Sequence, residues 1–404
     1  MSIKNNIEPP RIDTKNMFEA TYPKYMQKSL FGKIANFAYQ ILSVAIFPIY
    51  ALRYLKHRIH LFLGYHFFVP SQSYSKKENI DFYNKDGTKT DENQKEYLKK
   101  GLNYLKYSFK AQFIEIKTAD GVKLCGAFIP GKDDKGRYLS LNAPLIIHCL
   151  GQGGRFQDLG RYPDAIENIK KHNILVFNDR GVLKSEGRAT KKGLFLDIES
   201  IYQYAIRKLK VPKSKITVWG HSFGTLKAIY LAAKHKKIKS IYDRSPAEIQ
   251  KGVYYIAKEM FQEVFSYFVI LPFVIIEKMA SQRVVDKVVN FVTKHKIYIN
   301  GQLKRPIVIS KIIEVFSSIV AFVLSIITVS FDWGYSLAKE WANVKGKKII
   351  IYLKNDIKIT KAASFFNSVS KTKNEFIKIT DPKCSHWSEL SEKICDEVFR
   401  RLEA

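Results

Sequence analysis

Short apolar runs alternate with helical patterns through the middle and the end of the chain. Runs rich in β-branched residues predict strands at 112–117, 122–129, 143–149, 174–178, 216–219, 239–243, 348–353 and 376–379. Apolar residues at helical spacing predict helices at 96–108, 159–171, 193–209, 226–233 and 388–402. Because strands and helices alternate, we expect an α/β fold in which a mostly parallel sheet is flanked by helices.

Residues 247–346 interrupt this alternation. They contain no clear parallel strand, and they hold two long apolar runs, at 264–276 and 315–331, with basic stretches between them. We predict a helical cap, or lid, inserted over the carboxyl edge of the sheet, where it would exclude water from a site. A cap that contacts a membrane and a cap with an ordinary core both agree with the pattern.

Residues 1–110 are interpreted as a basic N-terminal extension. Residues 34–52 carry no charge and are about as long as a short membrane span, and basic residues follow at Arg53, Lys56 and Arg58. Polar residues at helical spacing within this run favour an amphipathic helix, so a span, a helix in the membrane plane and a hairpin all stay open. The remaining chain divides into a core at 111–246, the cap at 247–346 and the rest of the core at 347–404.

Lys and Arg outnumber Asp and Glu by 67 to 37, which gives a net charge of +30. Such an excess favours a polyanionic partner, either nucleic acid or an anionic membrane surface. The sequence lacks RNA-binding signatures and its basic residues flank apolar runs, so we expect a membrane surface and no nucleic acid. A lysine-rich solvated surface is the plainer alternative. The four cysteines form no paired motif, which predicts free thiols in a reducing compartment.

One stretch, GHSFG at residues 220–224, carries the candidate chemistry. A strand precedes it and a helix follows it, which is the context in which a tight turn exposes a serine nucleophile. We expect Ser222 to hold a strained backbone conformation, and the N–H of Phe223 to face a developing oxyanion. The glycine-rich loop at 150–154 follows another buried strand, and we assign a second oxyanion donor to the N–H of Gln152. Phosphate binding agrees less well with this loop, since it lacks a Gly-Lys-Ser/Thr ending.

A serine hydroxyl needs a base, and the base needs an acid that fixes its tautomer. Asp356 lies three residues after a predicted buried strand, and His386 lies in the loop after the next strand. The order Ser222, Asp356, His386, each at the carboxyl end of a strand, predicts a catalytic triad. Asp243 is an alternative acid, because it ends the strand that follows the nucleophile.

Other polar residues near these positions have plainer expected roles. We expect His221 to support the turn and His148 to be a hydrogen-bonded core histidine. Asp179 and Arg180 are expected to hold their loop through an ion pair, and Asp381 to brace the loop of His386. No residues show zinc-ligand spacing, and we expect neither a metal nor a cofactor.

These pieces together resemble the α/β-hydrolase superfamily of serine hydrolases. The matching motifs are DGVKL at 120–124, LGQGG at 150–154, NDRGVLKSEGR at 178–188, GHSFG at 220–224, KND at 354–356 and SHW at 385–387. The third motif is similar to Bem46-like and monoacylglycerol-lipase-like members, and the N-terminal region is similar to the chlamydial 43-kDa-protein family and to lipase-like Legionella effectors. The resemblance implies an α/β-hydrolase fold with a helical cap and an apolar helical N-terminal extension. Leu150 stands where such proteins usually carry a histidine, so only backbone donors would remain.

The sequence therefore predicts a membrane-associated serine hydrolase that cleaves a carboxylic ester or thioester of a lipid or acylated substrate. In this prediction Ser222 attacks, His386 transfers the proton, Asp356 orients His386, and Phe223 and Gln152 bind the oxyanion. A catalytically inactive hydrolase scaffold that acts as a membrane-bound interaction protein is the alternative. We place the catalytic domain in a reducing, cytosolic compartment, and a secreted bacterial effector at host membranes fits this placement. The oligomeric state and the acyl chain are not predicted.

Overall fold

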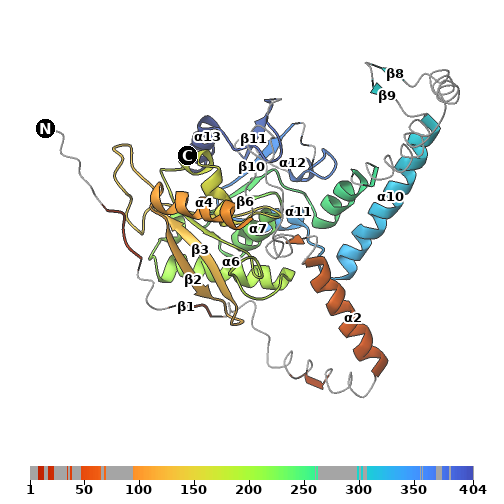
Figure 1. Ribbon diagram of the computed structural model, residues 1–404, viewed down its shortest axis with the longest axis horizontal. Coiled ribbons are helices and arrows are strands. Elements are labelled where there is room, and N and C mark those ends of the chain that lie inside the picture. The colour runs from red at the N-terminus through yellow and green to blue at the C-terminus, as the bar shows by residue number, and fades with distance from the viewer. Residues whose placement is uncertain are drawn as a thin grey trace.

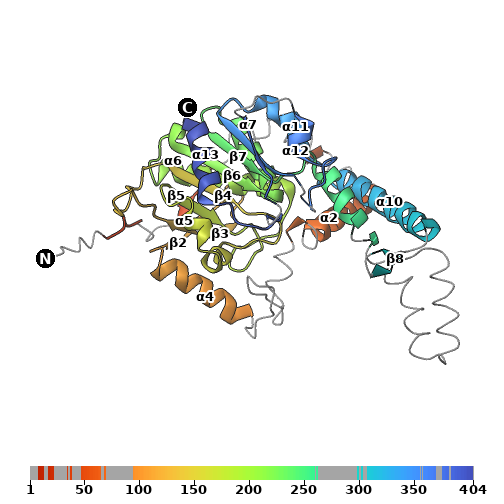
Figure 2. The same ribbon diagram turned by 90° about the horizontal axis from the view of Figure 1, so that it is seen from above.

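A nine-stranded sheet forms the centre of the protein (Figure 1, Figure 2). The computed structural model describes residues 8–12, 17–21, 34, 37–38, 47–64, 68–69, 94–259, 261–262, 298–299, 302–303, 307–354, 356, 358–369, 375–381 and 384–403. The strands of the sheet are β1 (Phe18–Glu19), β2 (Gln112–Lys117), β3 (Lys123–Ile129), β4 (Leu145–Cys149), β5 (Asn173–Phe177), β6 (Ile216–His221), β7 (Lys239–Asp243), β10 (Lys348–Leu353) and β11 (Phe376–Ile379). The predicted strands are confirmed, and their ends agree closely with the prediction.

The strand order across the sheet is β1-β2-β3-β5-β4-β6-β7-β10-β11. β2 and β3 form an antiparallel hairpin, and β3 is also antiparallel to β5. From β5 to β11 every neighbouring pair is parallel. The carboxyl ends of these parallel strands therefore share one edge of the sheet, and the loops that follow them meet there.

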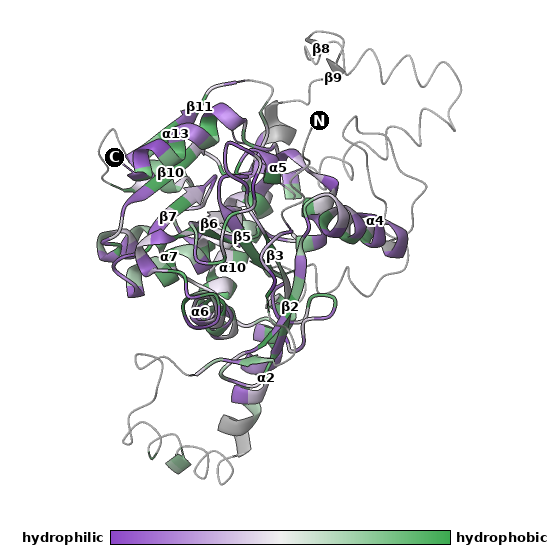
Figure 3. Cartoon of the chain, turned by 90° about the vertical axis from the view of Figure 1, so that its left-hand side faces the viewer, coloured by the Kyte–Doolittle hydropathy of each residue, from purple (hydrophilic) through white to green (hydrophobic). Residues whose placement is uncertain are grey.

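Helices cover both faces of the sheet. Ile147 of β4 lies in the hydrophobic cluster that includes α6 (Lys191–Arg207) and α7 (Thr225–Lys234). Its neighbour Ile146 lies in a second cluster with α4 (Gln94–Tyr107) and α13 (Glu392–Glu403). Because successive strand residues point to opposite faces, both faces of β4 carry buried apolar side chains. Figure 3 shows the hydrophobic residues gathered on the central strands.

One predicted helix is wrong in its extent. Instead of a single helix over 159–171, the chain forms a 3-10 segment, η3 (Phe156–Arg161), and one helical turn, α5 (Asp164–Glu167). Pro163 lies between them, and Tyr162 before it has φ of −125° and ψ of 69°, outside the helical region. A proline has no N–H to donate and disfavours a helical conformation in the residue before it, so one helix does not run through this point.

Two helices extend away from the sheet, α2 (Phe47–Leu63) in red-brown and α10 (Ile307–Ser330) in cyan in Figure 1. They meet at their carboxyl ends, where Trp333 Nε1–H donates to the His60 carbonyl at 3.0 Å and Lys56 pairs with Asp332 at 3.2 Å. α2 joins the end of the uncharged run at 34–52 to the basic residues after it. Most of that run, and the whole apolar run at 264–276, lie outside the described residues.

Within the described part of the chain, one helix is long and apolar enough to cross a membrane. Its window Ile313–Ser330 has a mean hydropathy of 2.1, and 22% of the window is buried. This window covers most of the apolar run predicted at 315–331. Between β7 and β10, the strands among the described residues are β8 (Tyr298–Ile299) and β9 (Gln302–Leu303), which form a short antiparallel pair.

Candidate active site

The turn between β6 and α7 holds a strained residue. Ser222 has φ of 49°, in the left-handed region that residues other than glycine rarely adopt. Gly224 permits the turn to approach the neighbouring strand, because a Cβ at this position would lie 2.1 Å from the Cys149 carbonyl oxygen at the end of β4. This packing presents Ser222 at the carboxyl edge of the sheet, as the GHSFG motif predicts.

Three residues far apart in the sequence meet at this edge. Ser222 Oγ lies 2.9 Å from His386 Nε2, and His386 Nδ1 lies 2.8 Å from Asp356 Oδ2. The side chains are buried, and His386 is 1% exposed. Asp356 Oδ1 also accepts the backbone N–H groups of Lys358 at 2.8 Å and Ile359 at 2.9 Å. A hydroxyl, an imidazole and a carboxylate are thus in continuous hydrogen-bond contact, the arrangement that nucleophilic catalysis by a serine requires.

The surroundings of Asp356 favour its charged form. Burial by itself raises the pKa of this carboxyl, but the hydrogen bond and charge of His386 and the two backbone donors outweigh burial, so the pKa lies below its ordinary value. A carboxylate beside Nδ1 keeps the imidazole proton on that nitrogen. His386 Nε2 can then accept the hydroxyl proton of Ser222.

Asp243, the alternative acid, contacts other groups. Its Oδ2 lies 3.0 Å from His221 Nδ1, and both of its carboxylate oxygens accept hydrogen bonds from Arg244. The structure therefore places Asp356 rather than Asp243 beside His386. The contact with Asp243 also lets His221 support the turn, because it joins the ends of β6 and β7.

Asp179 and Arg180 do not pair with each other, so the prediction of an ion pair between them is wrong. Arg180 donates to Asp120 at 2.8 Å and to Asp197 at 2.6 Å, and Asp179 pairs with Lys227 of α7. These partners belong to the turn after β2 and to α6 and α7. The loop after β5 is thus held by charges from three other elements rather than by a pair of its own.

The loop after β4 lies against the turn that carries Ser222. A Cβ at Gly151 would lie 2.9 Å from His221 Cδ2 and 3.4 Å from Ser222 Cβ. Gln152 is the next residue of this loop, and Phe223 is the next residue of the turn. The structure therefore brings the two segments that carry the predicted oxyanion donors into contact with each other.

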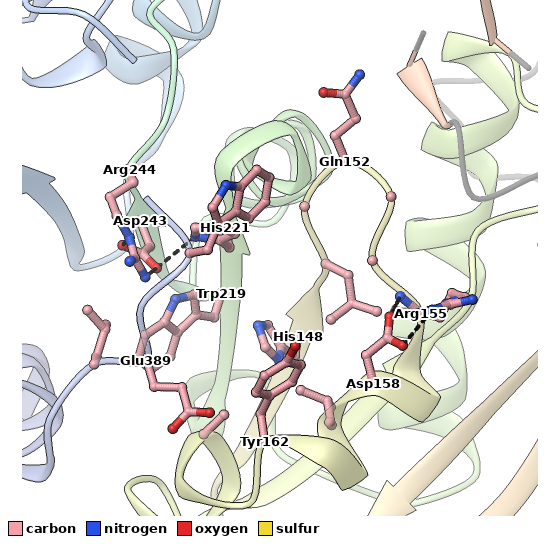
Figure 4. A pocket seen from close by; sticks show the side chains of 18 of the residues that line it. His148, Gln152, Arg155, Asp158, Tyr162, Trp219, His221, Asp243, Arg244 and Glu389 are labelled. Atoms are coloured by element: carbon pink, nitrogen blue, oxygen red, sulfur yellow. Dashed lines mark hydrogen bonds and ion pairs between the residues drawn. The ribbon is translucent and has the colours of Figure 1, made fainter. Parts of the chain in front are cut away.

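A cavity of about 580 Å³ opens beside this edge (Figure 4). Its lining includes His221 and Trp387, which are chain neighbours of Ser222 and His386, and an apolar part formed by Trp219. The volume is within the range of small-molecule sites.

His148 of β4 is partly buried and also lines this cavity. The side chain of Tyr162 lines the same cavity (Figure 4). Burial, and then the nearby His221, lower the pKa of His148 to about 4, which leaves the ring neutral at pH 7.

An aromatic stack connects the carboxyl ends of α2 and α10 to the turn. Phe68 stacks on Trp333 with ring centroids 4.3 Å apart, and on Phe223 with centroids 5.6 Å apart. The sequence offers no local signal for this contact, because Phe68, Phe223 and Trp333 are separated by more than a hundred residues each. The contacts of Arg244 with the loop of His386 were not predicted either. The sequence offers one signal for them, the charged pair Asp243 and Arg244 at the end of a buried strand.

Within the described residues, no group of three or more His, Cys, Asp or Glu side chains is arranged to hold a metal ion. The four cysteines are free, and all but Cys384 are buried.

The sheet order and the strained turn at Ser222 are those of the α/β-hydrolase fold, as the motifs predicted. Residues 145–261 match the family model described as alpha/beta hydrolase fold. The chain is similar to Protein bem46 of Schizosaccharomyces pombe, with 33% identity over 167 residues, which are 40% of this chain and 50% of that protein. The matched region thus spans about half the length of this curated relative. The resemblance to α/β hydrolases and to Bem46-like members is confirmed.

Solved structures with a similar fold include hydrolases from several organisms. The esterase Pf2001 of Pyrococcus furiosus is 20% identical with a TM-score of 0.44, over 73% of this chain and 90% of that one. The alpha-beta hydrolase of Vibrio vulnificus is 14% identical with a TM-score of 0.44, over 76% and 86% of the two chains. The enol-lactonase of Burkholderia xenovorans LB400 is 17% identical with a TM-score of 0.41, over 72% and 100%.

Proposed function

We propose that this protein is a serine hydrolase that cleaves a carboxylic ester or thioester. The main support is that His386 contacts both other residues: its Nδ1 lies 2.8 Å from Asp356 Oδ2, and its Nε2 lies 2.9 Å from Ser222 Oγ. In the proposed reaction, Ser222 Oγ attacks the acyl carbon while His386 Nε2 takes its proton, and His386 then protonates the leaving oxygen or sulfur. Water, activated by the same histidine, releases the acid and restores the serine.

The N–H groups of Phe223 and Gln152 are proposed to bind the oxyanion of the tetrahedral intermediate. The support is the close approach of the Gly151 segment to Ser222, since a Cβ at Gly151 would lie 3.4 Å from Ser222 Cβ. The cavity beside the triad would receive part of the substrate beyond its carbonyl group.

We further propose that the protein works at an anionic membrane surface on a lipid or acylated substrate. α10 exposes a stripe of large apolar side chains that are each between 48% and 58% exposed: Val315, Phe316, Ile319, Phe322, Val323, Ile326 and Val329. α2 adds exposed Leu52 and Leu55 next to the basic Arg53, Lys56 and Arg58. Apolar area combined with basic charge is typical of helices that bind anionic lipid.

The placement of this surface supports a role near the active site. The carboxyl ends of α2 and α10 join at Trp333, and the aromatic stack leads from Trp333 through Phe68 to Phe223, the residue after Ser222. The division into an extension, a two-part core and a cap at 247–346 remains our proposal for how these parts are organised. Free thiols agree with a reducing, cytosolic compartment.

Ester hydrolysis tests the proposed function. The full-length protein is assayed with p-nitrophenyl esters of increasing chain length, with and without anionic vesicles. We expect turnover by the wild type and a loss of about 10³-fold or more in kcat for Ser222→Ala and for His386→Ala. Turnover that persists in Ser222→Ala, or a folded wild type that hydrolyses no ester, contradicts the proposal and favours an inactive scaffold.

A further inference from the structure

A second buried polar network lies beside the triad. Arg244 follows β7 directly, has φ of 48°, and is 5% exposed. Its guanidinium binds the carboxylate of Asp243 with two hydrogen bonds, Nε to Oδ1 at 2.8 Å and Nη2 to Oδ2 at 2.7 Å (Figure 4). A bidentate pair of this kind fixes the plane of the guanidinium and therefore the direction of its third nitrogen.

That third nitrogen holds the loop of the proposed base. Arg244 Nη1 donates to the carbonyl oxygen of Ser385 at 3.0 Å and to that of Ser388 at 2.7 Å. Ser385 directly precedes His386, and Ser388 lies two residues after it. One guanidinium nitrogen thus fixes the backbone on both sides of His386.

The same network reaches the strand of the proposed nucleophile. Asp243 Oδ2, which binds Arg244, also lies 3.0 Å from Nδ1 of His221. His221 is the last residue of β6 and directly precedes Ser222. Contacts therefore run without interruption from the residue before the nucleophile, through Asp243 and Arg244, to the loop that carries the base.

The electrostatics keep both partners charged. Burial by itself raises the pKa of Asp243, but the charge of Arg244 and the hydrogen bond from His221 outweigh burial, so the pKa lies well below its ordinary value. Burial by itself lowers the pKa of Arg244, and the contact with Asp243 reverses this shift. A buried ion pair contributes little net stability relative to apolar residues, because both charges lose their hydration. The better explanation for the pair of Asp243 and Arg244 is that it orients the guanidinium towards the loop of His386.

We propose that Arg244 is a positioning residue for the hydrolytic triad: it fixes the loop of His386 relative to Ser222, so that Nε2 stays in hydrogen-bond contact with Oγ. This inference rests on the proposed function. Arg244 acts through the backbone of residues 385–388 and needs no contact with the acyl group. A misplacement of the base by about 1 Å costs on the order of 10²-fold in rate.

The test compares Arg244→Gln and Arg244→Lys with the matched control Arg180→Gln. Arg180 is 4% exposed and is held by two carboxylates, but its partners belong to other elements, Asp120 to the turn after β2 and Asp197 to α6. Arg244→Lys keeps the charge, whereas a single amine cannot reproduce the fork that binds a carboxylate and two carbonyls. The rate constant for labelling by a fluorophosphonate probe and the kcat and KM for a p-nitrophenyl ester are measured per folded protein.

We expect both Arg244 variants to be labelled about 10²-fold more slowly than the wild type, with kcat reduced and KM within about twofold. Arg180→Gln is expected to be labelled at the wild-type rate per folded molecule. In Arg244→Ala, guanidinium at non-denaturing concentration is expected to restore part of the labelling rate, because it refills the site of the lost group.

Three outcomes overturn the inference. The first is wild-type labelling in Arg244→Gln. The second is a loss of labelling rate that is equal in Arg244→Gln and Arg180→Gln and that matches the loss of folded protein in each variant. The third is an absence of guanidinium rescue in a folded Arg244→Ala protein. A wild type that is not labelled at all is distinguishable from these, because it refutes the proposed function and this inference together.

Discussion

At the scale of single residues, two aspartates lie at the carboxyl ends of the neighbouring strands β7 and β10, and they differ in the side chains that they contact. Asp356 lies 2.8 Å from His386, whereas Asp243 contacts His221 and Arg244. The residue types and the chain positions are the same kind of signal for both. Only the arrangement of the side chains in space distinguishes the proposed acid from the residue that supports the loop.

Substitution of the two aspartates tests this distinction. We expect Asp356→Asn to lower kcat for ester hydrolysis by about 10⁴-fold, because an amide no longer fixes the productive tautomer of His386. We expect Asp243→Asn to lower kcat by only about tenfold, because its effect passes through Arg244 and the loop. Steady-state kinetics with a p-nitrophenyl ester measures both, and a larger loss in Asp243→Asn would show that the assignment of the acid is wrong.

The lowered pKa of His148 predicts how the stability of the protein depends on pH. This pKa is about 4 in the folded protein and 6.5 as its ordinary value. Between these pH values the unfolded chain binds more protons at this histidine than the folded protein does. The free energy of unfolding is therefore not reduced by His148 above pH 6.5, and it falls as the pH drops from 6.5 towards 4. We expect the wild type to lose about 2–3 kcal/mol from this residue between pH 7.5 and 4.5, and His148→Asn to lack that loss.

Urea unfolding at the two pH values measures this difference. His57→Asn, at an exposed position of α2, is the matched control and is expected to keep the pH dependence of the wild type. The same pH dependence in His148→Asn and in the wild type would contradict the burial of a neutral imidazole at this site.

At the scale of the elements, the nucleophile turn depends on close contact between β4 and the start of α7. A Cβ at position 224 would lie 2.1 Å from the Cys149 carbonyl, so we expect Gly224→Ala to destabilise the protein by about 3 kcal/mol and to abolish labelling of Ser222. Gly121→Ala is the control, since it has φ of +83° but open space around it. Gly121→Ala is expected to lower the free energy of unfolding by about 1–2 kcal/mol and to leave the labelling of Ser222 unchanged. Thermal unfolding and probe labelling distinguish the two, and normal labelling in Gly224→Ala would refute the contact.

The elements that the sequence predicted well are those whose periodicity is local. Buried strands such as β7 and β10 are short apolar runs, and no neighbour is needed to recognise them. The helix predicted at 159–171 failed because apolar spacing continued across Pro163, where the backbone of a helix does not continue. The partners of Arg180 were not predictable, because they depend on which strands and helices become neighbours in the sheet. The same holds for the contacts of Arg244.

At the scale of the whole molecule, the exposed apolar stripe lies on α10 and exposed basic residues lie on α2, and the two helices meet at their carboxyl ends. We expect the protein to float with anionic vesicles, to float less at high salt, and to bind zwitterionic vesicles weakly. The triple variant Phe316→Ser, Ile319→Ser, Phe322→Ser is expected to lose flotation, because it removes apolar area from the stripe.

Phe113→Ser is the matched control, because it removes an exposed aromatic side chain from β2 on a different part of the surface. Flotation of the triple variant at the level of Phe113→Ser would show that the stripe does not bind lipid. Tight, salt-dependent binding of DNA or RNA without flotation would instead assign the positive charge to a nucleic acid.

The central claim is that Ser222 is activated by His386 and Asp356. Its most direct test is the reaction of the folded protein with a fluorophosphonate probe, with anionic vesicles present, followed by mass spectrometry of the labelled peptide. We predict one covalent adduct on Ser222 in the wild type and none in Ser222→Ala. An unlabelled wild type, or an adduct on another residue that persists in Ser222→Ala, would contradict the claim.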